Sequence, residues 1–122
     1  TCALPISNIR EHERRTAEAL ASAGYIVEFV VKSEISHTKS ADVFVNGIKW
    51  EIKSPISSNI KQIEKNLKKG VKQSRYLIID SQRVKSTSDI TLEKFLRQQV
   101  KRVKSIKRIL FINRQRKVFE LY

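Results

Sequence analysis

Two carboxylates and an amine stand close together in one short segment of the chain, as Asp42, Glu51 and Lys53. Between the acids lies Asn46-Gly47, a dipeptide that supplies the two positive φ angles of a type I′ turn and therefore predicts a β-hairpin. A two-residue turn at this point sets Asp42 directly opposite Glu51. Opposed side chains in an antiparallel ladder have Cβ atoms roughly 4.5–5.5 Å apart, and like charges there destabilise the sheet unless a cation neutralises them.

Side chains alternate along a strand, so the hairpin 41–53 is expected to have one apolar face and one charged face. The apolar face should consist of Val43, Val45, Ile48, Trp50 and Ile52. Hard cations such as Mg²⁺ are usually held by one or two carboxylates together with phosphate and water. We therefore predict a divalent metal site at Asp42 and Glu51, with Mg²⁺ favoured over Mn²⁺ or Zn²⁺. Lys53, on the same face, can orient water or stabilise charge that builds on phosphorus.

A helix is expected before the hairpin, from Ile9 to Ala23. Helical spacing places Glu13 on one stripe with Ala17 and Leu20, so Glu13 is the acid of this helix that should approach the sheet. Glu11 remains an alternative, because the helix dipole also favours an acid in the first turn.

Helices and strands alternate along the rest of the chain, which predicts one α/β domain over residues 1–122 with a mixed sheet flanked by helices. Strands are expected over Tyr25 to Val31, Arg75 to Asp80, Ile106 to Asn113 and Val118 to Tyr122. Further helices are expected over Ile60 to Gln73 and Ile90 to Val103. The helix between the hairpin and the strand Arg75 to Asp80 forms a crossover, so part of the pairing should be parallel.

Positive charge is concentrated in the second half of the chain. Residues 61–122 hold 18 of the 25 Lys and Arg but 5 of the 12 Asp and Glu, so the net charge of +13 lies entirely there. Such a field attracts a polyanion and anchors phosphates without discriminating sequence. We expect nucleic acid as the partner, bound by the exposed face of the helix Ile60 to Gln73 and by Arg75 just after it. The residues concerned are Lys61, Lys65, Lys68, Lys69, Lys72 and Arg75.

Three further residues are weaker candidates for the site. Gln73, at the end of its helix, can reach back toward Glu51 and Lys53. Ser74 follows Gln73 directly. His37 lies in the polar loop Lys32 to Ser40, where a histidine can protonate a leaving group or contact phosphate.

The spacing of Asp42 and Glu51-Ile52-Lys53 resembles the PD-(D/E)xK nuclease superfamily, whose pattern is an Asp at the end of one strand and Glu-x-Lys on the next. More narrowly, the chain is similar to the tRNA-nuclease domain at the C-terminus of contact-dependent growth inhibition toxins. The similar runs are Leu20 to Phe29, Ala41 to Val43, Trp50 to Pro55, Lys69 to Ser74 and Ile79-Asp80.

The resemblance implies a restriction-endonuclease-like fold, cleavage of tRNA with a divalent metal, and neutralisation by a cognate immunity protein. It also implies that the domain belongs to a larger secreted or cell-surface toxin and acts in the cytoplasm of a target bacterium. The absence of methionine fits a domain excised from a longer polypeptide. Within the site, the resemblance favours Glu13 as a third acid and implies a contribution from a glutamine or lysine in the helix that ends at Gln73.

Three alternatives remain open: a DNA endonuclease of the same fold, a metal-free RNase that uses His37 or His12, and a non-catalytic basic nucleic-acid-binding module. Other classes are excluded by composition. One Cys and two His make a structural zinc site implausible, and three glycines without a phosphate-loop motif leave nucleotide sites unsupported. No apolar stretch approaches the eighteen or so residues that a membrane span needs, so we expect no membrane segment in this domain.

Overall fold

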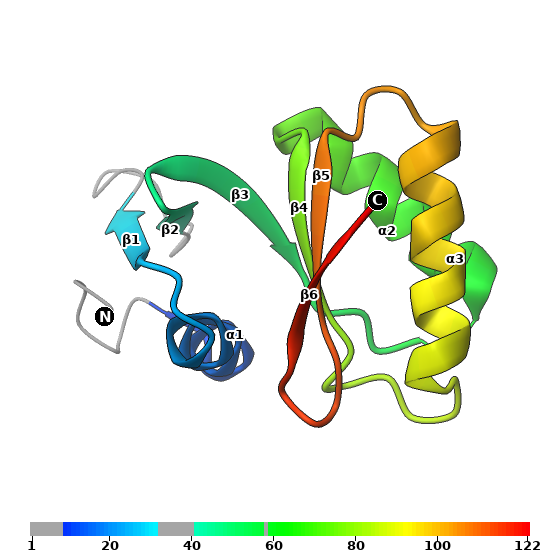
Figure 1. Ribbon diagram of the computed structural model, residues 1–122, viewed down its shortest axis with the longest axis horizontal. Helices are drawn as coiled ribbons and strands as arrows, with labels where there is room; N and C mark the ends of the chain where they lie inside the picture. The colour runs from blue at the N-terminus through cyan, green and yellow to red at the C-terminus, as the bar shows by residue number, and fades with distance from the viewer. Residues whose placement is uncertain (1–8, 32–40, 58) are drawn as a thin grey trace.

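A mixed β-sheet forms the centre of the fold, with helices on both of its faces (Figure 1). The computed structural model describes residues 9–31, 41–57 and 59–122. Along these residues the elements are α1 (Glu11–Ser22), β1 (Val27–Val31), β2 (Ala41–Val45), β3 (Ile48–Lys53), α2 (Ile60–Gln73), β4 (Tyr76–Asp80), α3 (Asp89–Arg102), β5 (Arg108–Ile112) and β6 (Val118–Leu121). The strand order is β1-β2-β3-β4-β5-β6. The predicted α/β class and order of elements are confirmed.

Strand pairing changes direction at β3. The pairs β1–β2 and β2–β3 are antiparallel, whereas β3–β4 and β4–β5 are parallel and β5–β6 is antiparallel. The parallel pairs are possible because α2 and α3 carry the chain back across the sheet between them. The predicted parallel component is therefore confirmed.

The turn at Asn46-Gly47 has the predicted backbone, with φ of 50° at Asn46 and 83° at Gly47. The predicted register also holds over three pairs, from Val45–Ile48 to Val43–Trp50. The expectation that Asp42 opposes Glu51 in the ladder is wrong. The β2–β3 ladder ends at Val43–Trp50. Beyond it Glu51 pairs with Leu77 of β4 on the other edge of β3, and Asp42 pairs with Val30 of β1 on the other edge of β2. The two strands separate beyond Val43–Trp50 and form a fork.

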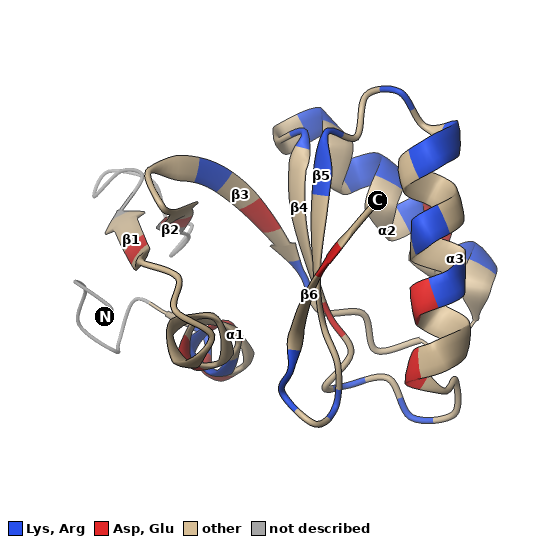
Figure 2. Ribbon diagram, in the orientation of Figure 1, with Lys and Arg blue, Asp and Glu red and all other residues tan. Residues whose placement is uncertain are grey.

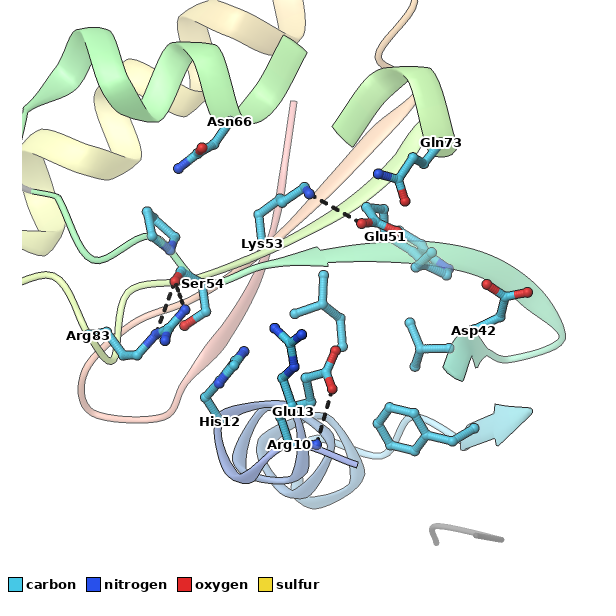
Figure 3. Close-up of a pocket in the computed structure, with 15 residues that line it drawn as sticks. Arg10, His12, Glu13, Asp42, Glu51, Lys53, Ser54, Asn66, Gln73 and Arg83 are labelled. Atoms are coloured by element: carbon cyan, nitrogen blue, oxygen red, sulfur yellow. Dashed lines mark hydrogen bonds and ion pairs between the residues drawn. The ribbon is translucent and has the colours of Figure 1, made fainter. Parts of the chain in front are cut away.

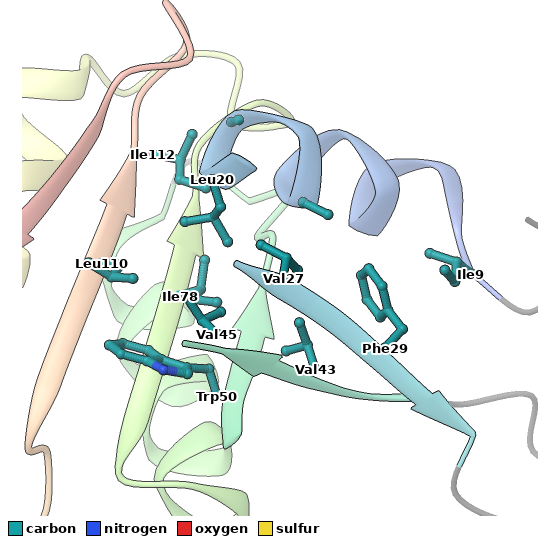
Figure 4. Packing of buried hydrophobic residues seen from close by; sticks show 12 residues of the cluster. Ile9, Leu20, Val27, Phe29, Val43, Val45, Trp50, Ile78, Leu110 and Ile112 are labelled. Atoms are coloured by element: carbon teal, nitrogen blue, oxygen red, sulfur yellow. The ribbon is translucent and has the colours of Figure 1, made fainter. Parts of the chain in front are cut away.

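Two hydrophobic cores lie on the two faces of the sheet. One core packs α1, with Leu20, against apolar residues of β1, β2, β3, β4 and β5, among them Phe29, Trp50 and Ile78 (Figure 4). The other packs α2 and α3 against the opposite face of β4 and β5. Of the expected apolar stripe of the hairpin, Val43, Val45 and Trp50 are buried, whereas Ile48 at the turn is 37% exposed and was wrongly expected inside.

Helix α1 begins at Glu11, two residues later than expected. Arg10 precedes it in an extended conformation, and Ile9 packs into the core beneath it. The strand predicted from Tyr25 begins at Val27, since the chain first leaves the helix through Gly24 at a φ of 97°. In the described residues no helix is long and apolar enough to cross a membrane.

Candidate active site

A polar pocket of about 370 Å³ lies at the fork between β2 and β3. Residues from both faces of the sheet line this pocket, because β2 and β3 no longer lie side by side at this point and do not separate the two faces. Its polar side chains come from five parts of the chain: the start of α1, β2, β3 with the residue after it, α2, and the loop after β4 (Figure 3). The predicted residues Asp42, Glu51, Lys53, Glu13 and Gln73 all line this pocket.

Glu51 and Lys53 are held together on the face of β3 that α2 covers. Alternation along the strand points both side chains to this face, and the Lys53 Nζ lies 3.3 Å from the Glu51 Oε2. With its amide nitrogen turned toward β3, Gln73 donates to both oxygens of Glu51, at 3.1 Å to Oε2 and 3.2 Å to Oε1. Glu51 is thus oriented by an ammonium and an amide, and about a fifth of its side chain is exposed.

Asp42 approaches the pocket from the other arm of the fork. Its side chain is 26% exposed, and its Oδ1 lies 3.7 Å from the Lys49 Nζ. Asp42 and Glu51 therefore share the pocket without sharing a rung of the ladder.

The donor set of the pocket suits a hard cation that brings its own water. Over the described ranges, no three or more His, Cys, Asp or Glu side chains form a group that could hold a metal ion. Asp42 and Glu51 supply carboxylate oxygens only, and Mg²⁺ is usually bound by one or two carboxylates plus water and substrate phosphate. The residues fit such an ion, whereas a structural zinc site would need four protein ligands, typically Cys and His.

The first helix contributes Glu13 to the pocket, as predicted from its stripe with Ala17 and Leu20. Its Oε1 accepts a hydrogen bond from the Arg10 backbone N–H at 3.2 Å, which fixes the carboxylate at the helix N-terminus. Glu11 is exposed and pairs with Arg14 instead, and this ion pair lowers its pKa. Glu13 is thus the acid of α1 that lines the site.

Four further residues line the same pocket: Arg10, His12, Ser54 and Arg83. The sequence predicted none of them as part of a metal site, and His12 was named only for the alternative of a metal-free RNase. Burial lowers the pKa of His12, and the positive charge of Arg83 lowers it further. No local pattern marks Arg83, because a contact with a residue far away in the chain holds it at the pocket: its Nε and Nη2 both donate to the Ser54 carbonyl, at 3.1 Å from Nε.

The side chain of Lys53 passes beneath α2 at Gly70, the one glycine of that helix. A Cβ placed on Gly70 would lie 3.4 Å from the Lys53 Cε and 3.1 Å from the Leu77 Cδ2. Glycine therefore lets the helix approach β3 and β4 closely enough to confine the lysine stem.

The remaining predicted residues lie outside the pocket. The Ser74 hydroxyl donates to the Lys49 carbonyl at 3.1 Å and accepts from the Tyr76 N–H, so it joins the end of α2 to the sheet. His37 falls outside the described residues. The five lysines of α2 and Arg75 are exposed, and Figure 2 shows Lys and Arg along α2 and α3.

Comparison with known proteins gives the chain a family. The family model described as the contact-dependent growth inhibition CdiA C-terminal domain matches residues 39–118, more than half of the chain. The chain belongs to this family. The matched CdiA C-terminal segment includes β2, β3 and α2 with Asp42, Glu51, Lys53 and Gln73.

The fold of this CdiA C-terminal domain is also similar to a solved structure, the CdiA-CT/CdiI toxin and immunity complex from Burkholderia pseudomallei. The match has a TM-score of 0.69 at 15% sequence identity and covers 90% of this chain and 81% of the other. At that identity the likeness concerns the fold. No curated protein sequence matches the chain. The resemblance to growth inhibition toxins is confirmed as family membership, while the nuclease activity, the substrate and the metal stay predictions.

Proposed function

We propose that this CdiA C-terminal domain is a metal-dependent endonuclease toxin that hydrolyses phosphodiester bonds of RNA, with tRNA as its substrate class. The observation that carries the proposal is the convergence of Asp42, Glu51, Lys53 and Glu13 on one polar pocket, with Gln73 hydrogen-bonded to Glu51. The basic surface of α2 beside this pocket supports a polyanionic substrate.

Each residue of the pocket has a role that follows from its contacts. Asp42 and Glu51 would hold the divalent cation from the two arms of the fork. Gln73 and Lys53 fix the rotamer of Glu51, so its oxygens keep one direction. Lys53 also keeps a positive charge beside the position where negative charge develops on the phosphate oxygens.

A divalent cation bound there supplies Lewis acidity toward the phosphate and a more acidic bound water. The net reaction adds water across a P–O bond: a water oxygen bonds to phosphorus, the bond to the leaving ribose oxygen breaks, and that oxygen takes a proton. Glu13, fixed by the Arg10 N–H at the start of α1, lines the pocket as a third carboxylate.

A metal-free RNase is the second candidate, favoured by the presence of His12 in the same pocket. A histidine that is largely neutral at pH 7 can accept a proton from a ribose 2′-hydroxyl. This mechanism requires RNA and no divalent ion, which separates it from the first.

The test is incubation of the domain with tRNA, total RNA and plasmid DNA, each with Mg²⁺ and with EDTA. We expect tRNA fragments with Mg²⁺ and none with EDTA. Full cleavage in EDTA that is lost in His12→Gln would replace the metal mechanism with the histidine one. Cleavage of plasmid alone would assign a DNA endonuclease, and binding without cleavage of any substrate would leave a basic nucleic-acid-binding module.

Family membership and the toxin–immunity complex with the similar fold support two further parts of the proposal. The domain is presented at a cell surface as part of a larger toxin and acts in the cytoplasm of a target bacterium. It is neutralised there by a cognate immunity protein. Co-expression of an immunity gene found beside the toxin gene should restore growth, and its product should co-purify with the domain.

A further inference from the structure

Ser54, His12 and Arg83 form a second polar group in the pocket, separate from the two acids of the fork. Figure 3 shows them on one side of Lys53, with Asp42 and Glu51 on the other. Three elements contribute to this group, because Ser54 follows β3, His12 belongs to α1 and Arg83 to the loop after β4.

Ser54 is the residue of this group that the fold itself leaves unexplained. The residue is 8% exposed and lines the pocket, yet its buried Oγ has no hydrogen-bond partner within the described part of the chain. A buried hydroxyl without a partner costs stability, so such groups in a native structure need an explanation. A ligand acceptor in the pocket would provide one.

Arg83 places a positive charge beside Ser54. Its guanidinium donates to the Ser54 carbonyl, at 3.1 Å from Nε, and makes no ion pair with any residue that the structure describes. Arg10 and His12 line the pocket next to it. Guanidinium groups present several N–H donors in a planar fork that matches the oxygens of a phosphate.

We propose that Ser54, His12 and Arg83, with Arg10 at the rim, form a second phosphate-binding subsite, which holds a phosphate of the nucleic acid next to the one that is cut. The proposal rests on the proposed nuclease function for its ligand. The subsite has a positioning role, because it fixes the strand so that the scissile phosphate lies between Asp42 and Glu51. The Ser54 hydroxyl and the guanidinium donate to the bound phosphate oxygens.

The test uses inorganic phosphate and a 5′-phosphorylated dinucleotide as probes, in EDTA so that no strand is cut. NMR signals of the Ser54 N–H and the Arg83 Nε–H should shift saturably in the wild-type domain. Ser54→Ala should weaken binding about tenfold, the effect of losing one hydrogen bond to a charged group. Its melting temperature should not fall, because the hydroxyl has no partner among the described residues to lose.

Ser105→Ala is the matched control, since Ser105 is exposed between α3 and β5, and it should bind phosphate like the wild type. Arg83→Gln should abolish the saturable shift. If that variant fails to fold without its bonds to the Ser54 carbonyl, Ser54→Ala still decides. Unchanged phosphate affinity in Ser54→Ala, or shifts that never saturate in the wild type, would overturn the subsite.

The outcome also separates this proposal from the nuclease proposal. Glu51→Gln should lose cleavage and keep phosphate binding, because the acid lies in the other group. A wild-type domain that binds phosphate in a Ser54-dependent way but cuts no nucleic acid would support the subsite and refute the nuclease. A domain that cuts RNA yet shows no saturable phosphate shift would refute the subsite alone.

Discussion

Glu51 and Asp80 lie on neighbouring parallel strands, and their surroundings are opposite. Asp80 is fully buried and accepts from Thr16 Oγ1 at 2.6 Å, from the Gln82 backbone N–H and side chain at 2.9 Å each, and from Arg116 at 2.8 and 2.9 Å. Glu51 keeps a fifth of its side chain exposed and faces a pocket. One acid has every oxygen engaged by the protein, whereas the other has lone pairs left for a ligand.

The contrast separates an acid that builds the fold from one available for chemistry. Asp80 joins α1 to the β5–β6 turn, since Thr16 lies on α1 and Arg116 on that turn. Gln82 adds a bond from its side chain to the His12 carbonyl at 3.0 Å. The buried centre thereby fixes the helix that carries His12 and Glu13 into the pocket.

The largest effect should follow from Glu51→Gln, which keeps the shape of the side chain and removes its charge. We expect cleavage to fall more than about 10³-fold, while the free energy of unfolding changes by less than about 0.5 kcal/mol. Glu93→Gln makes the same change on α3, where Glu93 pairs with Arg97, and should leave the cleavage rate unaltered. A Glu51→Gln protein with wild-type activity would remove Glu51 from the site.

Asp80→Ala should show the reverse pattern, a loss of stability. Removing one partner of a buried pair typically costs about 3–5 kcal/mol, and the lower end applies because Arg116 is 33% exposed. Urea unfolding measures this change. If Asp80→Ala were as stable as the wild type, the buried centre would not anchor α1.

Gly70→Ala should affect the site more than the fold. Alanine gains up to about 1 kcal/mol in helix propensity, but the added Cβ presses on Leu77 and on the stem of Lys53, so stability should change little. Displacement of Lys53 by a few tenths of an ångström should lower the cleavage rate about tenfold. Gln62→Ala, at an exposed position of α2, is the control and should cut at the wild-type rate.

The smallest effect concerns the pKa of His12, which burial and the charge of Arg83 hold below its ordinary value of 6.5. NMR titration should give a value below 6.5 in the wild type and a partial return toward it in Arg83→Gln, since burial persists. The lowered pKa means that the unfolded chain binds this proton more readily. Its contribution to stability is therefore complete above pH 6.5 and is lost as pH falls through the folded pKa. A His12 pKa of 6.5 or higher in the wild type would contradict the placement of His12 in a partly buried position near Arg83.

The sequence was sufficient for the local geometry of the hairpin and for the acids on it. Asn46-Gly47 specified the turn, and the alternation of apolar residues specified the faces, because both depend on neighbours in the chain. The direct opposition of Asp42 and Glu51 failed, since the choice of β4 as the second partner of β3 depends on how α2 crosses the sheet.

Residues brought in by distant contacts could not be found in this way. The position of His12 depends on Asp80 and Arg116, and that of Arg83 on the carbonyl of Ser54. No helical or strand periodicity relates these residues to one another in the sequence. Asp80 was predicted only as the last residue of a strand. Glu13 was identified because its helical stripe with Ala17 and Leu20 is a local property.

The exchange of partners by β3 also bears on the order in which the molecule assembles. The first half of β3 pairs with β2 across a two-residue turn, a contact that forms within microseconds in isolated hairpins. The second half, with Glu51 and Lys53, gains its neighbour β4 only after α2 has crossed over, and non-local pairings of this kind slow folding. A chain that enters a cell unfolded would thus assemble the Glu51–Lys53 side of its pocket late, and any activity that needs these two residues would begin only once folding is complete.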